Sequence, residues 1–125
     1  MVASVIDLFT SNGRKIAVVD TTVNHLPEVF EYQYSPQVLQ DIPDGRYEYR
    51  VVGASCLSGD LFGDYRFDKE LETGSRIIFS NVGAYMLVKA NMFNGINLPA
   101  IYALGRTGEI KQELKFEYKN YRNRL

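Results

Sequence analysis

The sequence of 125 residues contains no tryptophan, one histidine and one cysteine. A single cysteine excludes a disulfide within the chain and agrees with a reducing compartment, so we expect a cytoplasmic protein. Lysine and arginine together number 14, against 15 aspartates and glutamates, which gives a net charge of -1. This balance lacks the positive excess with which proteins neutralise a phosphate backbone, and it argues against a nucleic-acid partner.

Long apolar runs are also missing. Residues 1–7 have neither the basic start nor the apolar stretch of a secretory signal. No segment reaches the roughly 18 to 20 apolar residues that a membrane helix needs. The single histidine, His25, has no second histidine or cysteine at ligand spacing, so we expect no metal site there. A hydrogen-bonded structural histidine is the default interpretation.

What the chain does contain is short apolar runs, separated by glycine, proline, asparagine and aspartate, together with 9 tyrosines and 7 phenylalanines. This pattern is typical of an all-β domain. The clearest local signal is Asn12-Gly13, which supplies the positive φ angles of a tight hairpin turn between strands at 2–9 and 15–19. Further strands are expected at 47–52, 76–80, 85–90, 100–104 and 113–118.

A helical turn is expected only at 36–40, where Pro36 suits the first helical position. Seven short strands at this spacing predict a Greek-key barrel or sandwich. A chain of this length can bury about two thirds of its unfolded surface, so one domain over residues 1–125 needs no disulfide or metal to fold.

Cys56 lies in a turn of small residues that follows the strand expected at 47–52. The turn reads Gly53-Ala54-Ser55-Cys56-Leu57-Ser58-Gly59-Asp60. From residue statistics alone, a cysteine is more often a small buried hydrophobe than a catalyst. The small neighbours, however, offer little bulk to bury a thiol and permit close approach of a ligand or a second subunit. A thiol is mostly protonated at neutral pH and can donate a proton to a carbanion as a general acid.

Two carboxylates, Glu28 and Glu31, follow His25. Together with nearby aromatic rings they would suit a pocket for an ammonium group, through charge and cation–π attraction. The rings are those of Phe30, Tyr32, Tyr34 and Tyr47. Carboxylates that simply face water explain the same residues equally well, and the sequence leaves both interpretations open.

Several short motifs along the chain resemble those of one enzyme family. They are His25-Leu26-Pro27-Glu28-Val29, Ser55-Cys56-Leu57-Ser58-Gly59-Asp60, Gly63-Asp64-Tyr65, Tyr85 with Val88-Lys89, Phe93-Asn94-Gly95, and Phe116-Glu117-Tyr118-Lys119-Asn120-Tyr121. Each is weak alone, and together they are specific. Over residues 18–125 the chain resembles the C-terminal β-domain of the fold-type III pyridoxal-phosphate (PLP) decarboxylases, the ornithine, arginine and diaminopimelate group. Within that group it most resembles the enzymes that act on carboxynorspermidine or carboxyspermidine in polyamine biosynthesis.

The resemblance implies that the chain is one part of a larger enzyme, whose N-terminal β/α barrel carries the PLP lysine. The chain alone would then be inactive. The active site would form in a homodimer, where the barrel of one subunit meets this domain of the other. Cys56 would protonate the substrate Cα after CO₂ leaves, and Tyr85 would hydrogen-bond the cofactor phosphate. Lys89 is not expected to be the PLP lysine, because no barrel pattern surrounds it.

The resemblance also bears on the substrate. Leu57 stands where the ornithine and diaminopimelate enzymes carry an acid, and the carboxynorspermidine enzymes share this leucine. Glu31 falls where the ornithine enzymes hold a carboxylate for the distal amine, so it would bind an amine of the polyamine. His25 and Asp60 complete the expected substrate-binding set, with Asp60 orienting other groups rather than touching substrate. Ala84 replaces a histidine usual in the carboxynorspermidine enzymes, so a related amino-acid decarboxylase of secondary metabolism stays an alternative.

A hypothesis of another class is a non-catalytic docking or regulatory β-domain that binds a complete decarboxylase. The joint presence of Cys56, Asp60 and Tyr85 favours the enzyme, because a docking module would not need all three. An amino-acid racemase shares the architecture implied by the resemblance, but the cysteine loop gives it no support.

Overall fold

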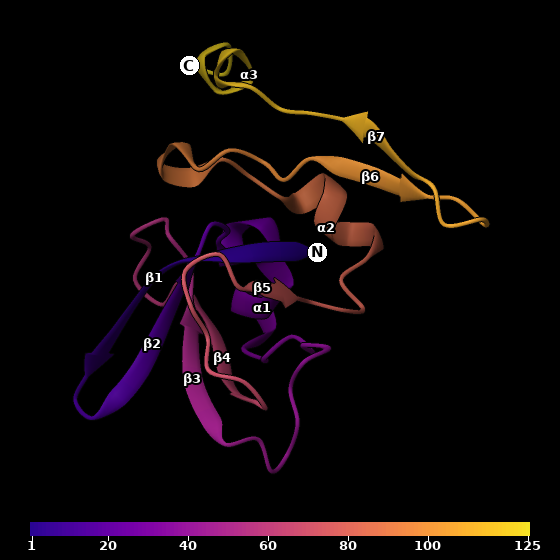
Figure 1. Ribbon diagram of the computed structural model, residues 1–125. Coiled ribbons are helices and arrows are strands. Elements are labelled where there is room, and N and C mark those ends of the chain that lie inside the picture. The colour runs from indigo at the N-terminus through magenta and orange to yellow at the C-terminus, as the bar shows by residue number, and fades with distance from the viewer.

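The computed structural model describes the backbone of residues 1–125 and every side chain except that of residue 84. It is dominated by a five-stranded sheet with the strand order β4-β3-β2-β1-β5 (Figure 1). Its strands are β1 (Val2–Ser11), β2 (Arg14–Val19), β3 (Tyr47–Val52), β4 (Leu61–Phe67) and β5 (Arg76–Ile78). Strands β2 and β3 pair in parallel, and the other neighbours are antiparallel. The all-β prediction is confirmed, in the form of an open half-barrel rather than a closed barrel.

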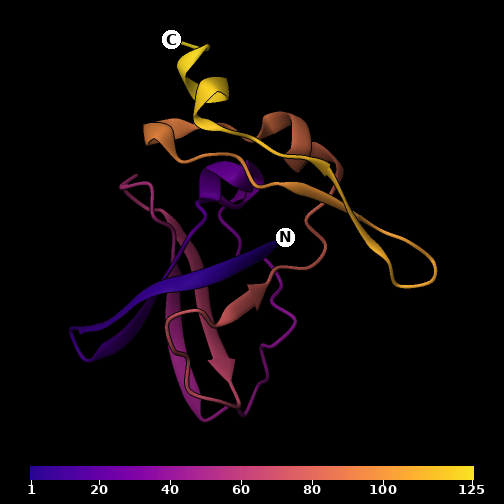
Figure 2. The same cartoon turned by 45° about the horizontal axis from the view of Figure 1, so that its top comes forward.

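Two short helical segments connect β2 to β3, and the residues after β5 form a separate layer. The connection contains the 3₁₀ turn η1 (Val23–His25) and helix α1 (Pro27–Tyr32). We call residues 84–125 the C-terminal layer; it contains α2 (Ala84–Lys89), η2 (Phe93–Gly95), β6 (Ile101–Leu104), β7 (Ile110–Leu114) and α3 (Tyr118–Arg122). Figures 1 and 2 both show this layer across one end of the half-barrel, next to α1 and the start of β1.

The β1–β2 hairpin forms as the sequence predicts. Asn12 and Gly13 have φ angles of 51° and 75°, the pair of positive values that a two-residue hairpin turn requires. Ser11 pairs with Arg14 across the turn, so the register of the two strands is fixed there.

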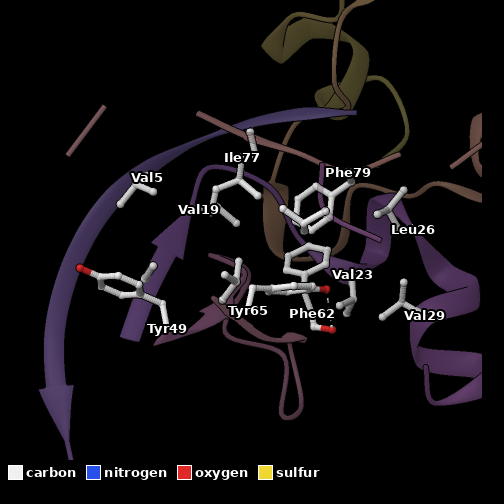
Figure 3. Packing of buried hydrophobic residues seen from close by; sticks show 14 of the residues in the cluster. Val5, Val19, Val23, Leu26, Val29, Tyr49, Phe62, Tyr65, Ile77 and Phe79 are labelled. Atoms are coloured by element: carbon white, nitrogen blue, oxygen red, sulfur yellow. Dashed lines mark hydrogen bonds between the residues drawn. The ribbon is translucent and has the colours of Figure 1, made fainter. Parts of the chain in front are cut away.

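The core lies on the concave face of the half-barrel, where side chains of all five strands meet those of η1 and α1 (Figure 3). Phe62 of β4 and Phe79, just after β5, lie with ring centroids 4.7 Å apart, and both are fully buried. Burying an aromatic or branched aliphatic side chain of this kind contributes about 1.5–3 kcal/mol. The packing fixes the position of the β3–β4 connection, which carries Cys56.

Two predictions for the C-terminal layer are wrong. Residues 85–90 were expected to form a strand, but α2 occupies residues 84–89. A short apolar run such as this one fits a helix or a strand equally well by periodicity. The strand expected at 113–118 ends at residue 114, and α3 begins at Tyr118. There the side chains of Glu117 and Asn120 form a capping box, which favours a helix start.

The helical turn expected at 36–40 is also absent. Val38 instead makes a β-bridge to Phe79. The helix of this connection is α1, which has Pro27 in its first turn. Strand β4 was not predicted, because Gly63 interrupts its apolar pattern. Gly63 is needed there, since a Cβ atom would lie 2.5 Å from the hydroxyl of Ser35.

None of the helices in the described chain is long and apolar enough to cross a bilayer.

Candidate active site

Cys56 lies at an exposed turn of the β3–β4 connection, residues 53–60, which we call the cysteine loop. Its backbone has a φ angle of +60°, in the left-handed region that L-amino acids other than asparagine and aspartate rarely adopt. Such a conformation costs about 1–3 kcal/mol and persists only where the surrounding structure holds it. The contacts of its neighbours therefore decide where the thiol points.

Asp60 closes the base of the cysteine loop. Its buried carboxylate accepts hydrogen bonds from the backbone N–H of Val23 at 2.8 Å and of Ser55 at 3.0 Å. It also accepts a hydrogen bond from the hydroxyl of Ser55 at 2.5 Å. A Cβ atom on Gly53 would lie 2.2 Å from a carboxylate oxygen of Asp60, so only glycine fits beside it. In this geometry Asp60 links the loop to η1.

Ser55, directly before Cys56, is the most tightly held residue of the loop. It is fully buried, and its hydroxyl accepts hydrogen bonds from the hydroxyl of Thr22 at 3.0 Å and the N–H of Leu57 at 3.3 Å. Its carbonyl accepts a hydrogen bond from the side-chain amide of Asn94 at 2.6 Å. Every polar group of Ser55 thus has a partner, while the thiol of its neighbour stays exposed.

His25 is buried away from the cysteine loop's exposed turn. Its Nδ1 lies 2.8 Å from the hydroxyl of Thr21, and its Nε2 has no hydrogen-bond partner within the described part of the chain. It lines a pocket of about 630 Å³ between the half-barrel and the C-terminal layer, whose wall includes Met86 and Ile101 but neither Cys56 nor Tyr85. Burial lowers the pKa of His25, and the negative charges of Asp60 and Asp20 oppose this only weakly.

Glu31 binds an ammonium group of its own chain. The Lys89 ammonium on α2 donates a hydrogen bond to the Glu31 carboxylate on α1, and lies 3.9 Å from a carboxylate oxygen of Glu28. It also lies 6.0 Å from the ring centroid of Tyr32, within cation–π range. The hydrogen bond to Glu31 raises the pKa of Lys89. Two carboxylates and an aromatic face thus surround one cation, and one unit of negative charge is left over.

Tyr85 lies in the first turn of α2, with 67% of its surface exposed. Lys89 follows four residues later, on the same side of the helix. The contact of Lys89 with Glu31 therefore ties the helix that carries Tyr85 to α1. The phenol is free to donate a hydrogen bond to a group that approaches from outside the domain.

The exposed side chains of Cys56 and Tyr85 are both open to groups outside this domain. An exposed phenol can donate to a phosphate oxygen, and an exposed thiol can reach a reacting carbon. No group of three or more histidine, cysteine, aspartate or glutamate side chains in the described residues could hold a metal ion.

Comparison with known proteins places the chain in a family. A family model described as the C-terminal sheet domain of pyridoxal-dependent decarboxylases matches residues 1–83, more than half of the chain. The protein therefore belongs to this family of PLP-dependent decarboxylase domains, and the resemblance seen in the sequence is confirmed.

Two named decarboxylases are similar to this chain over nearly its whole length. A carboxyaminopropylagmatine decarboxylase of Synechocystis sp. is 40% identical over 128 residues, covering 100% of this chain and 33% of the relative. A carboxynorspermidine/carboxyspermidine decarboxylase of Campylobacter jejuni is 34% identical over 135 residues, covering 97% of this chain and 35% of the relative.

A solved structure agrees with these relatives. The crystal structure of carboxynorspermidine decarboxylase from Campylobacter jejuni, complexed with norspermidine, matches with a TM-score of 0.92 and 33% identity. The match covers 99% of this chain and 37% of that one. The chain thus spans about a third of the length of the relatives it matches.

Sequence reasoning singled out Cys56 and Asp60 but missed the residues that hold them. Ser55 and Asn94 were noted only as parts of motifs, and Lys89 only as part of a motif and as a rejected candidate for the cofactor lysine. A buried serine between alanine and cysteine gives no signal of its own. Its partners lie 33 and 39 residues away in the sequence, at Thr22 and Asn94.

Proposed function

We propose that the protein is the C-terminal domain of a PLP-dependent decarboxylase that removes the carboxyl group of a carboxylated polyamine, in polyamine biosynthesis. The observation that carries this proposal is the cysteine loop: an exposed thiol, held in a left-handed turn by the buried carboxylate of Asp60. It occurs in a fold that matches carboxynorspermidine decarboxylase with a TM-score of 0.92. A domain used only for docking has no need to hold a thiol in this way.

In this reaction the domain would supply a proton donor and a group that binds the cofactor. Loss of CO₂ leaves an electron pair that PLP, when bound, delocalises. The thiol of Cys56 would hold the proton that the substrate Cα receives. The Tyr85 hydroxyl would donate a hydrogen bond to the cofactor phosphate, and the exposure of both side chains lets them reach a site built partly by another domain.

The substrate's cationic end would lie against Glu28 and Glu31. This follows from the one unit of negative charge that remains after Lys89 is counted. Carboxynorspermidine and carboxyspermidine present an ammonium group to it. We also consider carboxyaminopropylagmatine, because its decarboxylase in Synechocystis sp. is 40% identical over the whole chain. A planar guanidinium fits paired carboxylates and the face of Tyr32 as well as an ammonium does.

His25 has a different place in this proposal. Its ring is buried and lines the pocket beneath the C-terminal layer, a pocket whose wall includes neither Cys56 nor Tyr85. Asp60 likewise has both carboxylate oxygens engaged inside the domain. We therefore propose that Asp60 orients the cysteine loop and that His25 supports η1, with Glu31 as the contact to substrate.

We further propose that the domain joins an N-terminal PLP-binding barrel in its own chain and works as a homodimer. The chain spans about a third of its relatives' length, which leaves room for a barrel. The C-terminal layer exposes apolar side chains, a typical property of surfaces that bind other protein surfaces. They include Tyr85, Leu87, Val88, Tyr102, Leu104 and Ile110.

The test is to replace Cys56 in the full-length protein and to follow CO₂ release from carboxynorspermidine, carboxyspermidine and carboxyaminopropylagmatine. Cys56→Ala should slow turnover by a factor on the order of 10² to 10⁴, the usual contribution of a general acid, and leave bound PLP unchanged. Ser58→Ala, an exposed residue of the same loop, is the matched control and should keep full turnover. Unchanged turnover in Cys56→Ala would remove the thiol from the mechanism.

A full-length protein that releases CO₂ from none of the three compounds would leave two alternatives, a decarboxylase of a related amino acid and the docking domain. The 125-residue chain would then be mixed with a complete decarboxylase and analysed by size exclusion. Co-elution would support docking, and separate elution would argue against it.

A further inference from the structure

We propose that Asn94 is a positioning residue for Cys56, and that it acts through the peptide bond between Ser55 and Cys56. Its side-chain amide donates a hydrogen bond of 2.6 Å to the Ser55 carbonyl, from a segment 39 residues further along the chain. This inference rests on the proposed role of Cys56 as a proton donor. Asn94 would not touch the substrate in that role.

The bonded carbonyl belongs to the peptide unit that determines how Cys56 is oriented. The carbonyl of Ser55 and the N–H of Cys56 lie in one rigid plane. If that plane turns, the φ angle of Cys56 must change with it, and this angle is held at an unfavourable +60°. Asp60 holds only the N–H and the hydroxyl of Ser55. The carbonyl side of the residue depends on Asn94.

The turn that carries Asn94 is well suited to present its amide. Asn94 has φ and ψ angles of 54° and 23°, in the left-handed region that asparagine tolerates better than most residues. Met92, at the start of this turn, is buried, and the Asn91 side chain accepts the N–H of Phe93 at 3.0 Å. The donor is therefore delivered by a turn whose own shape is fixed.

The same segment also connects the two residues proposed to act in catalysis. Helix α2 begins beside Tyr85 and ends at Lys89, and η2 with Asn94 follows after a few residues. The hydrogen bond from Asn94 thus joins the segment that presents Tyr85 to the loop that presents Cys56.

The first experiment uses the 125-residue chain and measures amide hydrogen exchange in the cysteine loop. Asn94→Asp keeps the size and backbone preference of the residue but removes the N–H donor. The exchange of the Ser55 and Leu57 amides should become about 2- to 10-fold faster, as the loss of one hydrogen bond allows. Asn97→Asp is the matched control, because Asn97 donates the same kind of bond, 2.8 Å long, to the Phe116 carbonyl in the same layer. Exchange rates equal to those of the control would overturn the proposal.

The second experiment uses the full-length enzyme and asks whether Asn94 acts through the thiol. Asn94→Asp should lower kcat by about 3- to 10-fold, the effect of one lost hydrogen bond on alignment, with KM and bound PLP unchanged. In a Cys56→Ala background the same substitution should cause no further loss, because the group it positions is gone. An equal loss in both backgrounds would show that Asn94 acts elsewhere and would overturn the proposal.

The exchange experiment separates this proposal from the function on which it rests. If Cys56→Ala leaves turnover unchanged, the proposed function of the thiol fails, and the exchange experiment still decides whether Asn94 holds the loop. If Asn94→Asp does not fold, Asn94→Gly replaces it, since glycine adopts the same left-handed backbone freely and also lacks the donor.

Discussion

Replacing the buried carboxylate of Asp60 by an amide is the most direct test of how the cysteine loop is held. In Asp60→Asn, one carboxylate oxygen becomes an NH₂ group. Whichever oxygen is replaced, a donor then faces the N–H of Val23 or of Ser55, each bonded at 3.0 Å or less in the native domain. A hydrogen bond to a charged group contributes about 1.5–3 kcal/mol, and an unpaired buried donor costs about 1–3 kcal/mol. We expect the free energy of unfolding to fall by about 2–4 kcal/mol.

Urea unfolding of the 125-residue chain, followed by tyrosine fluorescence, measures this loss. With an m-value of about 2 kcal/mol/M, the midpoint should fall by roughly 1 to 2 M at unchanged slope. Asp64→Asn is the control, because Asp64 is a partly exposed carboxylate on β4 that pairs with Arg50 at 2.8 Å. Water screens that pair, so its loss should be less than half as large. An Asp60→Asn midpoint at or above that of the control would refute the reasoning.

Three further predictions concern the other site residues. Burial lowers the pKa of His25 below its value in the unfolded chain, so at acid pH the unfolded chain binds more protons than the folded chain. The free energy of unfolding should fall as the pH drops below about 6.5, and it should fall less in His25→Gln. Urea unfolding of both proteins at pH 7.5 and pH 5.5 measures this; an equal loss of stability in the two proteins would contradict it. Tyr85→Phe in the full-length enzyme should raise the Kd for PLP by about 10- to 100-fold in an absorbance titration, since a charge-assisted hydrogen bond is lost; equal cofactor occupancy would exclude that role. Glu31→Gln should raise KM for the cationic substrate with little change in kcat, whereas an unaltered KM would count against Glu31 as its contact.

The fold could be predicted from the sequence where local geometry decides it. Asn12-Gly13 strongly favours a tight hairpin turn from its own residues, and both have the expected positive φ angles. Residues 84–89 carry no such signal, because a run of six residues without glycine or proline fits either element; in the folded chain it forms a helix that contacts α1. Strand β4 was not predicted because glycine usually indicates a turn. Gly63 instead lies within the strand, where the absence of a side chain allows the backbone to approach Ser35 closely.

The candidate site could be predicted only in part, for the same reason. The small residues around Cys56 indicate a tight loop, and the structure has one. The left-handed conformation of the cysteine is not encoded next to it, however; it depends on Asp60 and on Asn94, which reaches Ser55 from 39 residues away. The pairing of Lys89 with Glu31 spans 58 residues and equally requires the folded chain. Contacts of this kind follow from tertiary packing and have no local signature.

The φ angle of Cys56 has a consequence for the balance between stability and activity. Glycine adopts a φ of +60° at little cost, whereas a residue with a side chain is strained there. Folding stability alone therefore favours glycine over cysteine at position 56. Glycine would relax the turn most, whereas under the proposed function cysteine is needed as the proton donor. On that proposal, the strain at this turn lowers stability in exchange for a reactive group, and the buried hydrogen bonds of Ser55 and Asp60 offset it.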